Sequence, residues 1–222
     1  MRHFAFVNVV LPIALFCGHA GATTITSSFG TDLDGWTANP QGILAFVATG
    51  GNPGGYLEET DASANGIMHV VAPAKFLGDL TGADSFSVDL ITYGTPITIQ
   101  AAFGTLTFLN SAAALSITLD LGNPLTVWAN YATPLTPAAF GVNAATYAAV
   151  MSNVTSLTLI LEADKAVDTE KVGMDNFTIS GANLIDAAVP EPASFAFVGA
   201  ALVLYGVARR SPGRRRSCEK SH

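Results

Sequence analysis

The stretch Ser85-Phe86-Ser87-Val88-Asp89-Leu90 places an apolar residue at every second position and a polar residue between each pair. A period of two is that of a β-strand with one buried and one wet face, because successive side chains of a strand point to opposite faces. The same alternation returns in three further segments, 115–121, 125–130 and 156–162. We therefore expect a mainly β fold.

Working outward, clusters of glycine and proline separate these segments at intervals typical of a sandwich, at 50–55, 94–96 and 122–124. One segment has a different period. Tyr147, Val150, Met151 and Val154 fall at i, i+3, i+4 and i+7, which predicts a helix of about three turns. The pattern predicts an antiparallel β-sandwich with one short helix, over residues 23–186, as a single domain of ordinary size.

The charge of this part of the chain is strongly acidic. Residues 23–189 hold 15 acidic and 3 basic side chains, a net charge of −12. Such a domain repels nucleic acid and anionic lipid, whereas calcium or a neutral polysaccharide suits it better. Cys17 and Cys218 both lie outside this range, so a disulfide, a thiolate zinc site and a cysteine nucleophile are excluded within it.

Candidates for catalysis are few. His69 is the one histidine of residues 23–189, and we interpret it as a strand residue that is packed or hydrogen-bonded locally. A Ser-His-Asp triad would rest on it alone, and a zinc site of several histidines is excluded. Glu58 and Glu59 are adjacent strand residues, so they point to opposite faces and cannot flank one sugar bond. We expect both in solvent, and we predict no catalytic residue.

Aromatic residues are the better candidates for contact with a ligand: Trp36, Tyr56, Tyr93, Trp128 and Tyr131. Exposed rings can stack on sugars. We expect Trp36 in the core. Trp128 alternates with Leu125, Val127 and Ala129, so it is the candidate for an outward-facing glycan contact, although burial on the second face is the alternative.

The first 22 residues have the three parts of a secretory signal peptide. Arg2 precedes an apolar run from Phe4 to Cys17, and the small residues Ala20-Gly21-Ala22 close it. The run is shorter than the roughly 20 apolar residues of a membrane span. We predict cleavage by signal peptidase rather than a permanent anchor.

The other end of the chain also carries an address. The triplet Pro190-Glu191-Pro192 lies in a linker, 187–194, and an apolar segment, 195–208, follows it. The basic tail, 209–222, contains Arg209, Arg210, Arg214, Arg215 and Arg216. Arginines beside an apolar segment are typical of the cytoplasmic flank of a membrane helix, which we favour over a nucleic-acid patch.

This arrangement of triplet, apolar segment and arginines resembles the PEP-CTERM sorting signal of Gram-negative bacteria. The resemblance implies export across the inner membrane, transient anchoring by residues 195–208 and processing by an exosortase, a membrane protease that recognises the Pro-Glu-Pro triplet. The final destination would be the cell surface or the extracellular matrix. An ordinary proline linker before a helix is the alternative.

A second resemblance covers much of the domain. Five blocks are similar in their order to the laminin B (laminin IV type A) domain: 28–36, 50–57, 72–79, 154–157 and 172–179. The resemblance implies a jelly-roll β-sandwich of the shape of carbohydrate-binding modules, with matrix roles and no catalysis. It also implies a structural calcium between the first and last strands, which points to Asp32, Asp34 and Asp175. Gly30 departs from the family, where an acidic residue is common. Solvated loop aspartates, with Asp175 bonded to a neighbouring turn, are the alternative.

The sequence thus predicts an exosortase-sorted surface or matrix protein with a non-catalytic jelly-roll domain that binds glycan, such as an exopolysaccharide. A purely structural matrix component and a polysaccharide-degrading enzyme are the alternatives.

Overall fold

The computed structural model describes residues 22–63, 66–94, 99–123, 125–164, 169–182 and 184. The chain divides into two units, 1–185 and 186–222, and every described residue belongs to the first unit. The predicted signal peptide up to residue 21, the Pro-Glu-Pro linker, the membrane helix and the basic tail therefore lie outside the described residues. Within the described ranges, no helix is both long and apolar enough to cross a membrane.

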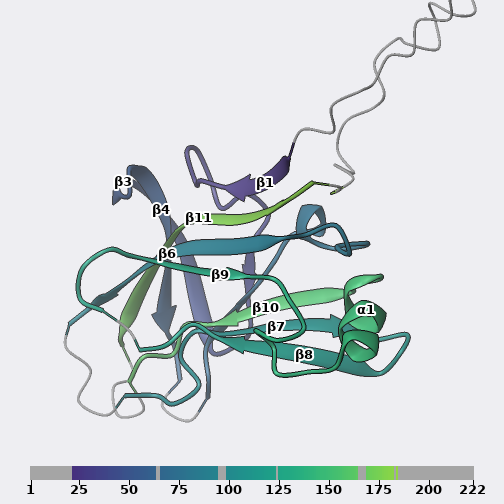
Figure 1. Cartoon of the computed structure of the whole chain (residues 1–222). Helices are drawn as coiled ribbons and strands as arrows, with labels where there is room; N and C mark the ends of the chain where they lie inside the picture. Colours follow the sequence, from purple (N-terminus) through teal and green to yellow (C-terminus); the bar gives the residue numbers. More distant parts are fainter. Residues whose placement is uncertain are drawn as a thin grey trace, which may run out of the picture. The chain divides into compact units, whose positions relative to one another are not determined.

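The described strands form two antiparallel sheets (Figure 1). The six-stranded sheet has the order β3-β4-β11-β6-β9, and β1 pairs with β11. Its strands are β1 (Thr23–Ser27), β3 (Gly42–Gly51), β4 (Gly54–Asp61), β6 (Ser85–Tyr93), β9 (Ala129–Pro134) and β11 (Lys171–Gly181). The five-stranded sheet has the order β2-β5-β10-β7-β8. Its strands are β2 (Thr37–Ala38), β5 (His69–Val71), β7 (Thr105–Asn110), β8 (Leu115–Asp120) and β10 (Ser156–Ile160). The predicted antiparallel β-sandwich is confirmed.

The core is built from the alternate residues that period two had marked. Phe86, Val88 and Leu90 of β6 are buried in one cluster, which also contains Ile117 and Leu119 of β8 and Leu157 and Leu159 of β10. Phe177 of β11 lies at an aromatic centre, with its ring centroid 4.7 Å from that of Trp36. The expectation that Trp36 is a core residue is confirmed, since it is 3% exposed.

The helical elements are short. A 3₁₀ turn, η1 (Ala74–Phe76), buries Phe76. The predicted helix is present as α1 (Ala144–Met151), beside the ends of β7 and β8 (Figure 1). The side chain of Asn143 caps it by accepting a hydrogen bond from the N–H of Thr146, and Val150 and Met151 are buried. The predicted helix is thus confirmed, but it is shorter than expected, because it ends at Met151 and Val154 instead forms a β-bridge with Gly78.

One predicted strand is wrong in part. Residues 125–130 were expected to alternate as a strand with Leu125 and Val127 inside, yet β9 begins only at Ala129. Leu125 and Val127 are 48% and 64% exposed. Trp128 is the residue of this segment that packs on the protein, against Tyr56, and Leu125 and Val127 are left in solvent. Alternation alone does not say which of the two sets of residues finds a partner.

Candidate functional site

The strongest candidate site lies on the outer face of the six-stranded sheet, by which we mean the side turned away from the core. Leu57, Val172 and Leu90 point into the core from β4, β11 and β6. Because side chains alternate along a strand, Glu58, Gly173 and Ile91 point outward, and these three are aligned across the sheet. Together these outward residues form the floor of a platform.

Three aromatic rings gather on this floor, and we call them the aromatic trio: Tyr56, Tyr93 and Trp128. The ring of Tyr56 lies edge-on to Trp128 at 5.4 Å and 6.2 Å from Tyr93. Tyr56 is almost fully buried beneath its neighbours, whereas Tyr93 is 41% exposed. The indole N–H of Trp128 donates to the carbonyl oxygen of Gly50 at 2.8 Å, which fixes the orientation of the ring.

Gly173 is what allows the rings to lie so close to the sheet. A Cβ atom at this position would lie 2.7 Å from the side chain of Ile91, 3.0 Å from Trp128 and 3.1 Å from Tyr56. Contacts of 3.0 Å or less would force the neighbours to move. The absence of a side chain at Gly173 therefore sets the depth of the platform.

A charged pair borders the aromatic trio. Lys171 contacts Glu58 at 2.5 Å between Nζ and Oε1, and the hydroxyl of Tyr56 donates to the other carboxylate oxygen at 3.3 Å. Burial raises the pKa of Tyr56, and the nearby Tyr93 and Glu58 add to that shift. The platform thus offers an ammonium group, a carboxylate and hydroxyls beside ring faces.

A polar network continues the outer face on its other side. Asp89 lies opposite Asp175 in the register of β6 and β11, and both are buried. Asp89 accepts from the side-chain amides of Asn130 at 2.7 Å and Asn176 at 2.8 Å. Asp175 accepts from the backbone N–H groups of Asn52 and Asn176. Burial raises the pKa of Asp175, which those two hydrogen bonds partly offset.

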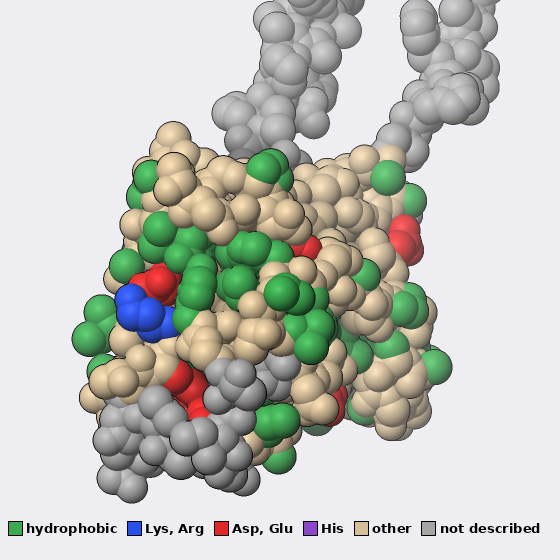
Figure 2. Space-filling model, turned by 90° about the vertical axis from the view of Figure 1, so that its left-hand side faces the viewer, with side chains coloured by type: hydrophobic (Ala, Val, Ile, Leu, Met, Phe, Trp, Pro, Cys, Tyr) green, Lys and Arg blue, Asp and Glu red, His purple; other side chains and the backbone are tan. Residues whose placement is uncertain are grey.

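Exposed apolar side chains lie around the site. Ile43 is 61% exposed and stands opposite Thr60, which is itself opposite Lys171. Leu125 lies near β6, since its carbonyl oxygen accepts from the N–H of Thr92. Figure 2 shows hydrophobic side chains gathered on one face of the molecule, beside basic and acidic side chains.

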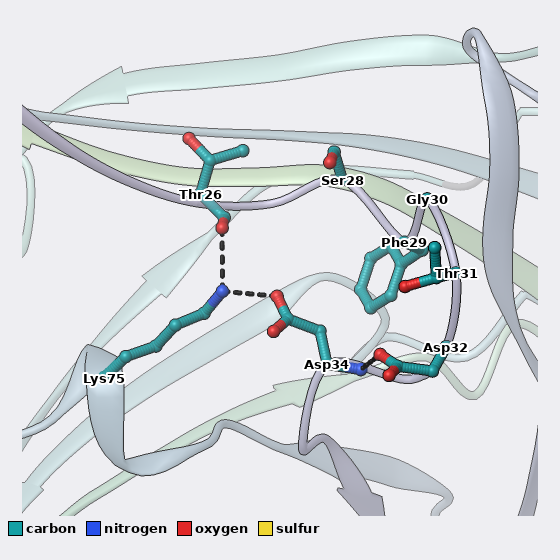
Figure 3. Close-up of a pocket in the computed structure, with 8 residues that line it drawn as sticks. All are labelled: Thr26, Ser28, Phe29, Gly30, Thr31, Asp32, Asp34 and Lys75. Carbon is teal, nitrogen blue, oxygen red and sulfur yellow. Dashed lines mark hydrogen bonds and ion pairs between the residues drawn. The ribbon is translucent and has the colours of Figure 1, made fainter. Parts of the chain in front are cut away.

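A hollow of about 340 Å³ lies between β1 and the following loop, apart from the platform. Its lining contains Asp32, Asp34 and Lys75, which Figure 3 shows at close range. The ammonium group of Lys75 contacts the carboxylate of Asp34 and donates to the carbonyl oxygen of Thr26 at 2.7 Å. Asp32 accepts from the N–H of Asp34 at 2.7 Å.

These contacts do not fit the predicted calcium site. Asp32 and Asp34 are brought together, but Asp175 makes its hydrogen bonds with Asn52 and Asn176. Lys75 already supplies a cation to Asp34 and occupies the Thr26 carbonyl, an oxygen ligand of the kind calcium uses. Over the residues that the structure describes, no group of three or more acidic, histidine or cysteine side chains can hold a metal ion. The alternative, in which Asp175 bonds to a neighbouring turn, describes the observed contacts.

The other residues that the sequence singled out have local partners or are buried. His69 lies in β5, where its N–H donates to the side chain of Asn39, and Tyr131 donates its hydroxyl to the carbonyl of Asn123. Glu58 and Glu59 face opposite sides of β4, as predicted. The expectation that both lie in solvent is wrong: Glu58 pairs with Lys171 and Glu59 is fully buried, because it shares the inner side of β4 with Leu57.

Sequence reasoning named all three rings of the trio but missed Lys171 and Gly173. The signal was present in the segment 171–175, Lys-Val-Gly-Met-Asp, whose odd positions share one face once the segment is recognised as a strand. Which strand lies next to it is set by pairing over long sequence distances, and that pairing is what brings Gly173 beneath Trp128.

Comparison with known proteins gives a likeness of fold. No protein-family model and no curated protein matches the chain. Among solved structures, an exo-β-agarase has a TM-score of 0.51 at 13% identity, over 82% of this chain and 30% of the enzyme. A xylan-binding domain of carbohydrate-binding module family 22 has 0.43 at 14% identity, over 72% and 96%. The L4b domain of human laminin α-2 has 0.46 at 9% identity, over 67% and 98%.

The agarase match shows the β-sandwich fold alone, because 13% identity is too low to transfer a function or site residues. The chain spans less than a third of that enzyme, and likewise of a xylanase from Clostridium thermocellum that it matches. The laminin domain has a TM-score below 0.5, so the laminin B resemblance of the sequence stays a prediction.

Proposed function

We propose that the domain binds a neutral polysaccharide on the outer face of the six-stranded sheet and does not cleave it. The observation that carries this proposal is the aromatic trio over Gly173, with the half-exposed ring of Tyr93 at the surface. Aromatic rings offer apolar faces to the C–H groups of sugars, and a few placed polar groups then fix the orientation of the ligand. Glu58 and Lys171 supply those polar groups for sugar hydroxyls.

The shape and charge of the platform support a chain-like, uncharged ligand. Tyr56, Gly173, Tyr93 and Trp128 come from four neighbouring strands or their ends, and the ring of Tyr56 lies 5.4 Å from that of Trp128 and 6.2 Å from that of Tyr93. Rings gathered so closely suit contact with one or two sugar rings of a chain. A net charge of −12 over residues 23–189 opposes a polyanion.

Retention and hydrolysis are tested together on a panel of neutral polysaccharides. The purified full-length protein is run through native gels that contain each polysaccharide, and reducing ends are assayed in parallel. We expect retardation without release of reducing ends. Tyr93→Ala should abolish most of the retardation, while the matched control Leu115→Ala, an exposed apolar residue on the other sheet, should keep it. Release of reducing ends would favour the enzyme alternative, and no retardation by any member would favour the structural one.

We further propose that the chain reaches the surface or matrix through its Pro-Glu-Pro signal, on the strength of the sequence pattern at residues 190–216. The arginines would hold the tail in the cytoplasm until a membrane protease acts. Glu191→Ala should trap the full-length chain in the inner membrane, whereas the released wild-type protein should lack Arg209–Arg216 by intact mass. Normal release of the variant would refute the sorting proposal and leave the binding proposal untouched.

A further inference from the structure

Five buried carboxylates meet at one end of the sandwich, and we call them the carboxylate cluster: Glu59, Asp61, Glu162, Asp164 and Glu170. Their exposed fractions run from 0% to 9%. Two come from the inner side of β4, two from the segment after β10 and one from the residue before β11. Burial of so many acidic groups together is unusual, because acidic residues are almost never fully buried unless they are paired.

Backbone groups satisfy part of the cluster but leave one member out. Asp61 accepts from the N–H of Ser63 at 2.9 Å, Glu162 from Met68 at 3.1 Å and Glu170 from Ala163 at 2.6 Å. Glu59 is 0% exposed, and neither of its carboxylate oxygens has a hydrogen-bond partner. A buried ionised carboxylate without a partner is strongly unfavourable.

The neighbouring strand leaves space for the side chain of Glu59. A Cβ atom at Gly42, on the neighbouring β3, would lie 2.0 Å from Oε1 of Glu59. Any residue other than glycine there would displace the carboxyl group. The space around Glu59 is therefore shaped for a carboxyl group rather than filled by an apolar neighbour.

No described cation compensates Glu59. Lys75 pairs with Asp34 and Lys171 with Glu58 on the opposite side of the sheet, and the chain has no arginine between residues 3 and 208. The ionisable groups that act on Glu59 are Glu162, Asp61 and Glu170, all acidic. Lys165 lies outside the described residues. A proton from solution can neutralise Glu59, and over the described residues no side-chain group can hold a metal ion.

We propose that the carboxylate cluster is a proton-binding site, which is loaded in the folded domain at neutral pH and loses its protons as the solution becomes alkaline. The ligand is the proton, and Glu59 is its principal acceptor.

The direction of the titration follows from burial and then from the like charges nearby. The pKa of Glu59 is raised from 4.5 to about 8, first by burial and then by the neighbouring carboxylates of Glu162, Asp61 and Glu170. Burial also raises the pKa of Glu170, to about 7. A pKa raised by folding means that the folded state binds the proton more tightly than the unfolded state. Stability is therefore full below pH 4.5 and is lost as the pH rises toward 8, beyond which this group adds no further change.

The test compares two adjacent residues of β4. Thermal unfolding of the full-length protein is measured from pH 5 to pH 9 in EDTA, for the wild type, Glu59→Gln and Glu58→Gln. Glutamine imitates the protonated acid, so Glu59→Gln should melt close to the wild type at pH 5 and above it at pH 8. Glu58→Gln removes a carboxylate from the other face and should keep the pH dependence of the wild type.

Equal pH dependence in Glu59→Gln and the wild type would overturn the proposal. So would restoration of the melting temperature at pH 8 by millimolar calcium, which would make the cluster a metal site. Should Glu59→Gln not fold, carbon NMR of glutamate carboxyl groups in the wild type decides the matter. A buried glutamate that titrates near pH 8 supports the proposal, and titration of every glutamate near pH 4.5 refutes it.

Discussion

Glu58 and Glu59 are neighbours in the chain and belong to two different environments. Glu58 lies on the outer face, where it contacts Lys171 and accepts from the hydroxyl of Tyr56. Glu59 lies between the sheets, among other carboxylates and without a partner. Successive side chains of a strand point to opposite faces, so Glu58 lies beside the proposed ligand platform and Glu59 lies in the proposed proton site. The outer face and the inner side of β4 can therefore be broken separately.

The largest effect is expected on the inner side. Phe177→Ala removes the ring that contacts Trp36, Phe76 and Phe86 in the core. We expect the free energy of unfolding to fall by about 3–5 kcal/mol, the usual cost of a buried aromatic. Denaturant titration of the full-length protein measures it. A loss as small as that of an exposed residue would mean that the two faces do not differ as described.

The next effect concerns the outer face and is one of binding. Trp128→Ala removes a half-buried ring that packs on Tyr56. We expect retention on polysaccharide to weaken at least tenfold, or about 1.4 kcal/mol, with a smaller loss of stability than Phe177→Ala. Affinity electrophoresis and denaturant titration of the same preparation separate the two. Unchanged retention with a core-sized loss of stability would make Trp128 a structural residue.

A third change sharpens the account of the inner side. Glu170→Gln removes the second carboxyl group whose pKa burial raises, to about 7. The stability lost between pH 4.5 and pH 7 should be smaller in this variant than in the wild type. This reduction should itself be smaller than the reduction caused by Glu59→Gln. Thermal unfolding across that range gives the comparison. A steeper pH dependence in the variant would contradict the assignment.

A smaller effect is expected for the outer ion pair. The side chain of Lys171 is 48% exposed, and exposed pairs contribute about 0.2–1 kcal/mol. Lys171→Met should therefore lower the unfolding free energy by less than about 1 kcal/mol, and the difference should shrink in high salt. Denaturant titration at two salt concentrations checks both points, and a larger, salt-independent loss would show that Glu58 needs this partner to be tolerated.

The smallest effect is expected for calcium at Asp32 and Asp34, where Lys75 already neutralises Asp34. Binding to the folded state alone would raise the melting temperature by mass action. We expect the same melting temperature in EDTA and in millimolar calcium at pH 5, where Glu59 and Glu170 are protonated. A clear rise in calcium would restore the metal site that the sequence had suggested.

The parts of the fold that depend on local patterns were predictable. The alternation around Phe86 and Val88 predicted their strand, and the spacing of Val150 and Met151 predicted the helix. Properties that depend on pairing were not predictable in this way. The environment of Glu59 requires β3, the end of β10 and the start of β11 to meet, and exposure at Val127 depends on which ring finds a partner.

The pairing of β1 with β11 has a mechanical consequence. The first strand of the domain lies antiparallel beside the last, with Thr23 opposite Gly181, and Figure 1 shows the two side by side. Strand β11 also pairs with β4 and β6, so three neighbours hold it. A pull along the chain at Gly181 loads these hydrogen bonds in shear, and many must break together before the strand moves. A domain that is tethered at this end and drawn by a bound polymer would resist tension through its most heavily bonded strand.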